Sequence, residues 1–246
     1  MTDKKSELSA AIKNSVAEPK NFRRIIGEPH KINQKNIEII NKTKINNHFI
    51  KNNNDFRETI IKQININDEV LDVGKSMRGF FDKIKSKSII TLDVNEFEDY
   101  PDIVFDLCDE LPENLNRKFD KIICIAILEH VYNPFKAVGN LKKMLKENGT
   151  IYGYVPYLYK YHAPNDLMFQ DYFRFSKDAL SYLFKDFHSI ELFPVRGRIS
   201  APLNIVIPNI LKKFIEKLNI NLILDKISSD RINGIQCSGY NFIVKK

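Results

Sequence analysis

The chain has 246 residues and a mass of 28.7 kDa, the size of one large domain or of one domain with a substantial attachment. Hydrophobic residues make up 43% and charged residues 28% of the sequence, which excludes a disordered, fibrous or collagen-like chain. The longest apolar run, Ile122 to Leu128, is far shorter than the ~18–20 residues that a membrane-spanning helix needs, so we expect no transmembrane segment.

The net charge of +7 is unevenly distributed along the chain. Residues 1–66 carry +6, residues 67–120 carry −7 and residues 121–246 carry +8. The lysines are scattered singly among Asn and Ile, whereas a nucleic-acid surface usually shows a concentrated basic stripe with interleaved aromatics. We therefore do not expect a nucleic-acid partner, and the basic flanks suit a small anionic or phosphorylated substrate.

The cysteines and the N-terminus bear on the compartment. Cys108, Cys124 and Cys237 are odd in number, widely spaced and without a Cys-x-x-Cys pair, which predicts buried thiols in a reducing cytoplasm. Met1 to Lys20 holds no apolar stretch that could form the core of a signal peptide, so we expect a cytoplasmic protein.

The first third of the chain reads as a helical extension. Residues 1 to about 20 have no periodicity and are expected to be frayed. From Asn33 to Ile66 apolar positions recur every three to five residues, which predicts helices with one buried stripe. Asn54 or Asp55 is the expected N-cap of the second helix. Residues 1–66 are thus predicted to form an N-terminal helical cap.

After Asn67 short β-rich runs alternate with helical stretches. The predicted strands cover residues 70–73, 89–92, 102–105, 121–127 and 150–155, and the predicted helices cover residues 134–145 and 177–184, the second capped by Ser176. Near-continuous apolar strands separated by helices indicate a parallel sheet covered on both faces.

Two further strands are expected to close the sheet. They cover residues 188–195 and 239–244, with a helical segment over 208–224 between them. The sequence therefore predicts an α/β domain over residues 67–246, with a seven-stranded, mostly parallel sheet, an antiparallel last strand and a helical insertion at about 200–232.

A nucleotide site is indicated where the first of these strands ends. The strand leads into Gly74, and Asp93 follows 19 residues later at the end of the next strand. In open α/β sheets the ligand lies at the carboxyl ends of the strands, where a glycine admits the ligand to the backbone and an acid bonds the ribose hydroxyls.

Four motifs in order now identify a family. They are Asp72-Val73-Gly74-Lys75-Ser76-Met77-Arg78-Gly79, Thr91-Leu92-Asp93-Val94-Asn95, Phe105-Asp106-Leu107-Cys108 with Leu111-Pro112, and Lys118 to Cys124 followed by Ala126-Ile127-Leu128-Glu129-His130-Val131. Over residues 67–193 the chain resembles the class I S-adenosylmethionine-dependent methyltransferases, of the type 11-like kind. Their first motif carries three glycines; here only Gly74 is in register, and Ser76 and Arg78 replace the other two.

The resemblance implies a Rossmann-like fold, S-adenosylmethionine as cofactor, S-adenosylhomocysteine as product, and methyl transfer that uses neither a metal nor a hydride. The cofactor contacts it implies are Asp72, Gly74, Lys75, Ser76, Asp93, Asp106, Leu107 and Ala126. Asp93 would hold the ribose and Asp106 the adenine amine, with Asp102 and Asp109 as nearby alternatives. Lys75 and Arg78 either pair with the methionine carboxylate or are ordinary loop cations.

Two segments beyond the fifth strand would choose the acceptor. Tyr, His, Asp and Arg are concentrated over residues 155–166 and 169–176, as in a substrate lip. The candidate substrate residues are Tyr157, Tyr161, Asp166, Asp171, Tyr172 and Arg174. The His-x-x-Pro and Asp-Tyr-x-Arg-Phe pattern resembles methyltransferases of surface-glycan and capsule biosynthesis, which implies O-methylation of a sugar or phosphoryl-type decoration. Arg174 either clamps a phosphate or pairs with Asp171 or Asp178.

His162 is the first candidate for the catalytic base. A neutral imidazole, with an ordinary pKa of ~6.5, can accept the proton of a hydroxyl acceptor. Asp166 and Asp171 would orient His162 or bind the acceptor. His130 is the second candidate, with a packed imidazole at a helix entry as the alternative. No metal ligand is expected.

Two other functions remain open. An RNA or protein methyltransferase would share the cofactor site, and binding to RNA would weaken steeply with salt. A non-catalytic relative would have lost the cofactor through Ser76 and Arg78, and calorimetry with the cofactor distinguishes it.

Overall fold

The computed structural model describes residues 31–46, 53–164, 168–208 and 235–246, with six single positions between 209 and 234. The residues expected to be frayed, and most of the helical segment expected over 208–224, lie outside this part. The chain divides into two units, Met1–Glu38 and Ile39–Lys246. The predicted domain boundary at residue 66 stays a prediction, and the second unit begins before it.

The second unit contains one eight-stranded sheet in the order β1-β7-β8-β6-β5-β2-β3-β4. The strands are β1 (Thr43–Ile45), β2 (Glu69–Val73), β3 (Ser88–Asp93), β4 (Ile103–Val104), β5 (Phe119–Ile125), β6 (Leu145–Pro156), β7 (Ser189–Val195) and β8 (Gly239–Lys245). β8 lies between β6 and β7 and runs antiparallel to both, while the other neighbouring pairs are parallel. The mostly parallel sheet with an antiparallel last strand is confirmed.

The predicted strand count of seven is wrong because β1 is added within a stretch expected to be helical. Thr43 pairs with Ile190 of β7, and the Thr43 hydroxyl donates to Oγ of Ser181 at 2.7 Å. Both ends of this three-residue strand, Thr43 and Ile45, are β-branched and suit a pleated strand. Pairing with β7 therefore overrides the helical spacing.

The described helices are α3 (Lys31–Asn41), α4 (Asn53–Gln63), α5 (Pro134–Met144), α6 (Lys177–Leu183) and α7 (Ser200–Val206). The N-cap expected at Asn54 or Asp55 is wrong, because α4 already begins at Asn53. The cap at Ser176 is confirmed, since its side chain accepts the N–H of Ala179. None of the helices in the described ranges has the length and apolar character needed to cross a bilayer.

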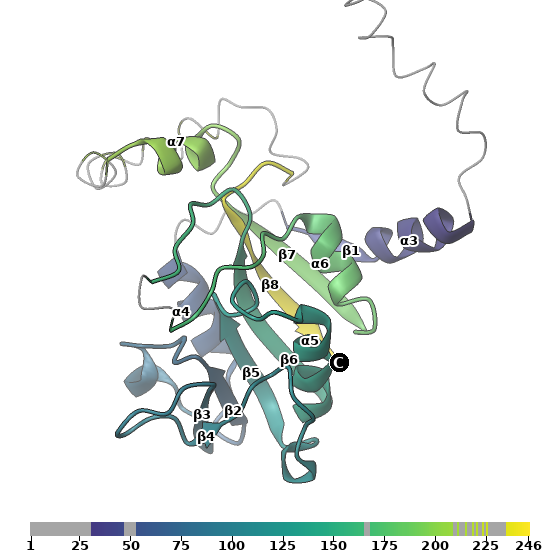
Figure 1. The fold of residues 1–246 in the computed structure, drawn as a ribbon, viewed down its shortest axis with the longest axis vertical. Coiled ribbons are helices and arrows are strands. Elements are labelled where there is room, and N and C mark those ends of the chain that lie inside the picture. The colour runs from purple at the N-terminus through teal and green to yellow at the C-terminus, as the bar shows by residue number, and fades with distance from the viewer. Residues whose placement is uncertain are drawn as a thin grey trace, which may run out of the picture. The chain divides into compact units, whose positions relative to one another are not determined.

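Both faces of the sheet are covered by helices. Successive side chains of a strand point to opposite faces, so a continuously apolar strand needs cover on both. Leu71, Ile122 and Cys124 pack in a cluster with residues of α5 and α6. Their strand neighbours Val70 and Ile123 pack in a second cluster with residues of α4. Figure 1 shows α5 and α6 in front of the sheet and α4 behind it. The carboxyl ends of the parallel strands therefore meet at one edge, between two helical layers.

An ion-pair group links the amino ends of the strands, opposite the carboxyl ends. The Lys146 ammonium, in β6, donates to Glu69 of β2 at 2.7 Å and to Asp120 of β5 at 2.8 Å. Lys87 also donates to Glu69, at 3.0 Å. These pairs hold the pKa of Glu69 down to about 2.

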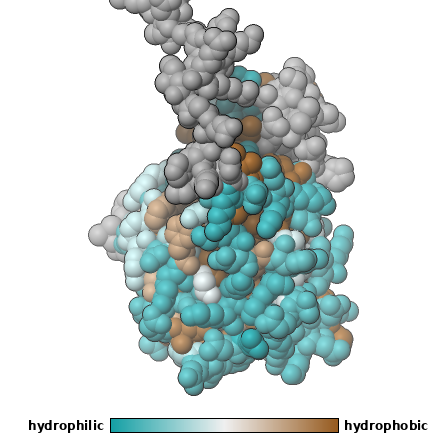
Figure 2. Space-filling view, turned by 90° about the vertical axis from the view of Figure 1, so that its right-hand side faces the viewer, coloured by the Kyte–Doolittle hydropathy of each residue, from teal (hydrophilic) through white to brown (hydrophobic). Residues whose placement is uncertain are grey.

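On the face that Figure 2 shows, hydrophilic residues predominate over the described surface, with apolar residues in patches between them.

Two of the three cysteines are buried as predicted. Cys124 and Cys237 are buried, whereas Cys108 is only half-buried, so the expectation is wrong for Cys108.

Candidate active site

The turn after β2 has a conformation that favours glycine at its first position. Gly74 has a φ of +67°, and a Cβ there would lie 2.2 Å from Cδ1 of Ile127. The Asp72 carboxylate, fully buried, accepts the backbone N–H groups of Ser76 and Met77 at 3.0 and 3.1 Å. Burial raises the pKa of Asp72 to about 7, and the two N–H groups oppose that shift. The carboxylate thus fixes the path of the loop.

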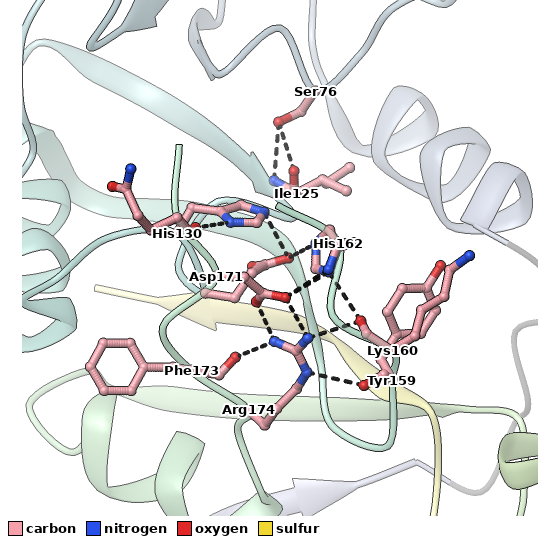
Figure 3. A network of polar contacts seen from close by, with 11 residues as sticks. Ser76, Ile125, His130, Tyr159, Lys160, His162, Asp171, Phe173 and Arg174 are labelled. Atoms are coloured by element: carbon pink, nitrogen blue, oxygen red, sulfur yellow. Dashed lines mark hydrogen bonds and ion pairs between the residues drawn. The ribbon is translucent and has the colours of Figure 1, made fainter. Parts of the chain in front are cut away.

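Ser76, a predicted cofactor contact, joins two strand ends. Its buried hydroxyl donates to the carbonyl oxygen of Val73 at 2.6 Å and accepts the N–H of Ile125 at 3.1 Å, the second contact being visible in Figure 3. Ser76 therefore links the ends of β2 and β5 with its side chain.

Asp93 lies at the end of β3 with an aromatic neighbour. Its carboxylate accepts the Tyr100 hydroxyl and the Asn95 N–H, each at 3.0 Å. The Lys75 ammonium lies 4.9 Å from the centre of the Tyr100 ring. Lys75 and Asp93, both predicted cofactor contacts, are therefore linked through Tyr100.

The carboxyl groups on either side of β4, Asp102 before it and Asp106 after it, have separate roles. Asp106 accepts the N–H of Cys108 at 2.7 Å, and Leu107 between them is buried. The alternative Asp102 accepts both the N–H and the hydroxyl of Thr91, each at 2.7 Å. Asp102 thereby holds the β3 backbone, and the assignment of the adenine amine to Asp106, with Asp109 as its alternative, stays a prediction.

A cavity of about 300 Å³ opens at the ends of β5 and β6. Ala126 lines it and has a φ of +56°, the left-handed region that a non-glycine residue rarely adopts. The polar residues around the cavity are Arg57, Glu129, Tyr154, Tyr159, His162 and Arg196. Such backbone strain is found preferentially at functional sites.

Glu129 is the functional candidate that the sequence reasoning missed. It is fully buried, and neither carboxylate oxygen has a hydrogen-bond partner among the described residues. A buried polar group that makes no hydrogen bond is costly. The one sequence signal was an acid placed directly after the longest apolar run of the chain.

The two predicted catalytic histidines meet at Glu129. Nε2 of His162 lies 3.7 Å and Nε2 of His130 lies 3.8 Å from Oε1 of Glu129, and the two ring centres are 4.8 Å apart. The pKa of His162 is raised, mainly by Glu129, with burial opposing the shift. The fold therefore brings together two imidazoles that lie 32 positions apart in the sequence.

Arg174 and Asp171 form an ion-pair clamp beside His162 (Figure 3). The guanidinium makes a bidentate contact with the Asp171 carboxylate and donates to the carbonyl oxygens of Tyr159, Lys160 and Phe173. Its five N–H groups are thus all used, so the ion pair with Asp171 is the alternative that the contacts support. The pair holds the pKa of Asp171 down to about 2.

Of the other predicted substrate residues, those that the structure describes do not line the cavity. Tyr157 packs against the ring of Tyr240, with centres 6.3 Å apart, and Tyr161 is 69% exposed. The Tyr172 hydroxyl donates to Gln170 at 3.1 Å. Asp166 lies outside the described residues.

No family model matches the chain, and no curated protein matches it. Among solved structures, it is similar to a methyltransferase complexed with the Trm112 activator of Haloferax volcanii, with a TM-score of 0.48 and 16% identity over 77% of this chain and 88% of that one. It is similar to a phosphoethanolamine N-methyltransferase of Haemonchus contortus, with a TM-score of 0.46 and 15% identity over 73% of this chain and 48% of that one. It is also similar to a methyltransferase of Methanosarcina mazei, with a TM-score of 0.46 and 12% identity over 76% of this chain and 96% of that one. At TM-scores below 0.5 these likenesses say nothing about cofactor or acceptor.

Proposed function

We propose that this chain is an S-adenosylmethionine-dependent methyltransferase that methylates an oxygen of a small or glycan-linked anionic acceptor. One observation carries the proposal. A glycine turn, an acid suited to bind ribose hydroxyls and a cavity with titratable groups all lie at the carboxyl ends of the parallel strands. Gly74, Asp93 and Ala126 supply these three positions at the ends of β2, β3 and β5.

The cofactor would lie across these strand ends. Gly74 admits a ligand close to the backbone, Asp93 would accept the ribose hydroxyls, and Asp106 would accept the adenine amine, as in open α/β sheets generally. Methyl transfer needs the sulfonium carbon in line with the attacking atom, so much of the acceleration comes from positioning.

The acceptor would occupy the cavity. Arg57 and Arg196 line it together with the phenols of Tyr154 and Tyr159, a lining that suits an anionic group flanked by hydroxyls. Its volume of about 300 Å³ is at the lower end of small-molecule sites. A sugar or phosphoryl-type decoration of a capsular or surface polysaccharide fits these features and the sequence pattern around Asp171 and Arg174.

The acceptor proton would pass to the group at Glu129. A hydroxyl must lose its proton as the C–O bond forms and the C–S bond breaks, which leaves S-adenosylhomocysteine. His162 is the proposed base. Asp171 and Arg174 are positioning residues for the His162 ring, and His130 lies next to that ring. General-base assistance is worth about 10²–10⁴-fold, so His162→Ala should lower kcat by that factor with cofactor affinity intact.

Turnover with S-adenosylmethionine labelled in its methyl group tests the proposal. The panel comprises a hexose phosphate, a hexuronic acid, a neutral hexose, total RNA and an unmodified protein. We expect label on the anionic sugars and little on the neutral one. Label on RNA with a steep salt dependence, or on protein alone, would overturn the acceptor assignment.

A further inference from the structure

Glu129, His130 and His162 place three electron-pair donors around one point. Their ligand atoms all lie within 4.8 Å of one another. The two Nε2 atoms lie 3.7 and 3.8 Å from Oε1 of Glu129, too far for hydrogen bonds. In the described part of the chain neither Glu129 oxygen has a hydrogen-bond donor.

The environment of each ring fixes which nitrogen faces Glu129. Nδ1 of His130 meets the carbonyl oxygen of Gln170 at 2.5 Å. Nδ1 of His162 lies 3.2 Å from Oδ2 of Asp171 and 3.3 Å from the carbonyl oxygen of Lys160. Carbonyl and carboxylate oxygens only accept hydrogen bonds, so Nδ1 carries the proton in each neutral ring and Nε2 presents its lone pair.

These outer contacts are those that metal-binding histidines require. A ligating imidazole usually donates its other N–H to a carboxylate or a backbone carbonyl, which fixes the tautomer and the ring orientation. Asp171 plays this part for His162 and is itself held by Arg174, and the Gln170 carbonyl plays it for His130. The outer shell of a site is therefore built before any ion arrives.

We propose that Glu129, His130 and His162 bind a divalent first-row transition-metal ion. Two imidazoles and one carboxylate are the ligands of several catalytic zinc and non-haem iron sites, which keep further positions open. A tetrahedral ion about 2.1 Å from each ligand would hold the ligands about 3.4 Å apart and so draw a pair at 4.8 Å together by about 1.4 Å, a movement within reach of side-chain rotation. Glu129 and His162 line the cavity, so an open position faces it.

The metal site goes beyond the proposed function and is independent of it, because ion binding needs neither cofactor nor acceptor. Where methyl transfer also holds, the role of His162 would change, because its Nε2 would be a ligand and could not act as the base. The ion would then supply the acidification of an acceptor hydroxyl that the base supplies in its absence.

Metal content and thermal stability of the full chain test the site. The protein is stripped with a chelator, loaded with Zn²⁺ or Mn²⁺ and desalted; bound metal is measured by mass spectrometry, and Mn²⁺ also by electron paramagnetic resonance. We expect one ion per chain and a higher melting temperature with metal, because an ion that binds the native state stabilises it. A wild-type chain that retains no metal and whose melting temperature does not change overturns the proposal.

Variants locate the ion. Glu129→Gln and His162→Gln should each weaken binding by at least about tenfold, as even outer-shell changes do. His188→Ala removes an exposed histidine outside the cluster and should bind as the wild type does. Because one ligand variant could fail to fold, circular dichroism precedes each titration and the other variant decides. Wild-type affinity in a folded ligand variant would place the ion elsewhere and contradict the assignment.

Discussion

The Oδ2 atom of Asp171 contacts His162 twice: it accepts the His162 backbone N–H at 3.0 Å and lies 3.2 Å from Nδ1 of the same residue. The ring is therefore held at both its backbone and its side chain, and Nε2 is directed at Glu129. The segment that holds His162 and Asp171 follows β6 in the sequence. It thus completes a cluster whose first members, Glu129 and His130, follow the end of β5.

Arg174→Ala should destabilise the fold. The Asp171 side chain is fully buried and the Arg174 side chain is 26% exposed, so the change leaves a buried carboxylate without its guanidinium partner. We expect a loss of about 3 kcal/mol, the lower end for a broken buried pair, measured by urea unfolding.

Two comparisons sharpen that measurement. Arg174→Lys should not restore stability, because an ammonium lacks the planar fork. Arg117→Ala removes an arginine whose contact with Glu147 is exposed and should cost about 0–1 kcal/mol. Equal losses for Arg174→Ala and Arg117→Ala would refute the clamp.

Ser76→Gly should destabilise the protein, although the methyltransferases that the sequence resembles carry a glycine at this position. The change removes the hydroxyl that accepts the buried N–H of Ile125, and an unsatisfied buried group costs about 1–3 kcal/mol. Ser86→Ala, at a position that is not buried, is the matched control and should change stability by no more than about 0.5 kcal/mol. An unfolding free energy of Ser76→Gly equal to that of the wild type would show that the bridge contributes nothing.

Asp93→Ala should weaken binding of S-adenosylhomocysteine by about 1–3 kcal/mol, the cost of losing a charged hydrogen-bond partner. Titration calorimetry gives the affinity. Asp99→Ala, an exposed carboxylate of the same segment, should leave it unchanged. If both variants bind like the wild type, Asp93 does not hold the ribose.

Acid should reduce stability through Glu69, at the edge of the sheet remote from the site. Its pKa is about 2 in the folded chain against an ordinary 4.5, so the unfolded chain takes up the proton first as the pH falls. The contribution is present above pH 4.5 and is lost as the pH falls toward 2. Lys146→Met removes the main partner and should flatten this part of the curve of unfolding free energy against pH. Lys62→Met, at an exposed position of α4, should keep the wild-type slope, and parallel curves for all three proteins would exclude the ion-pair group as its source.

Much of the sheet could be predicted because its strands are local patterns. β2, β3, β5 and β6 are short apolar runs bounded by turn residues, and a parallel sheet covered on both faces requires such runs. β1 could not be found in this way, since three residues carry no period and their pairing with β7 depends on contacts more than 140 positions away. The strand is a product of tertiary structure.

The site divides in the same manner. Gly74 and Asp93 could be proposed because their roles depend on a turn and a strand end that are visible in sequence. The state of Glu129 could not, because its lack of a hydrogen-bond partner among the described residues is a property of the packed structure. For Arg174 the sequence left a phosphate clamp and an ion pair open, and the carbonyl contacts that favour the ion pair come from Tyr159 and Lys160.

Titration calorimetry of S-adenosylhomocysteine into the wild-type chain tests the central claim most directly. The account predicts saturable binding of one ligand per chain, since the glycine turn and the ribose-type acid are both in place. It also predicts that Gly74→Val abolishes binding. Valine would have to adopt a positive φ at this position, and its Cβ would clash with the side chain of Ile127. Absence of binding to the folded wild-type protein would contradict the account and would indicate a methyltransferase-like fold that no longer binds the cofactor.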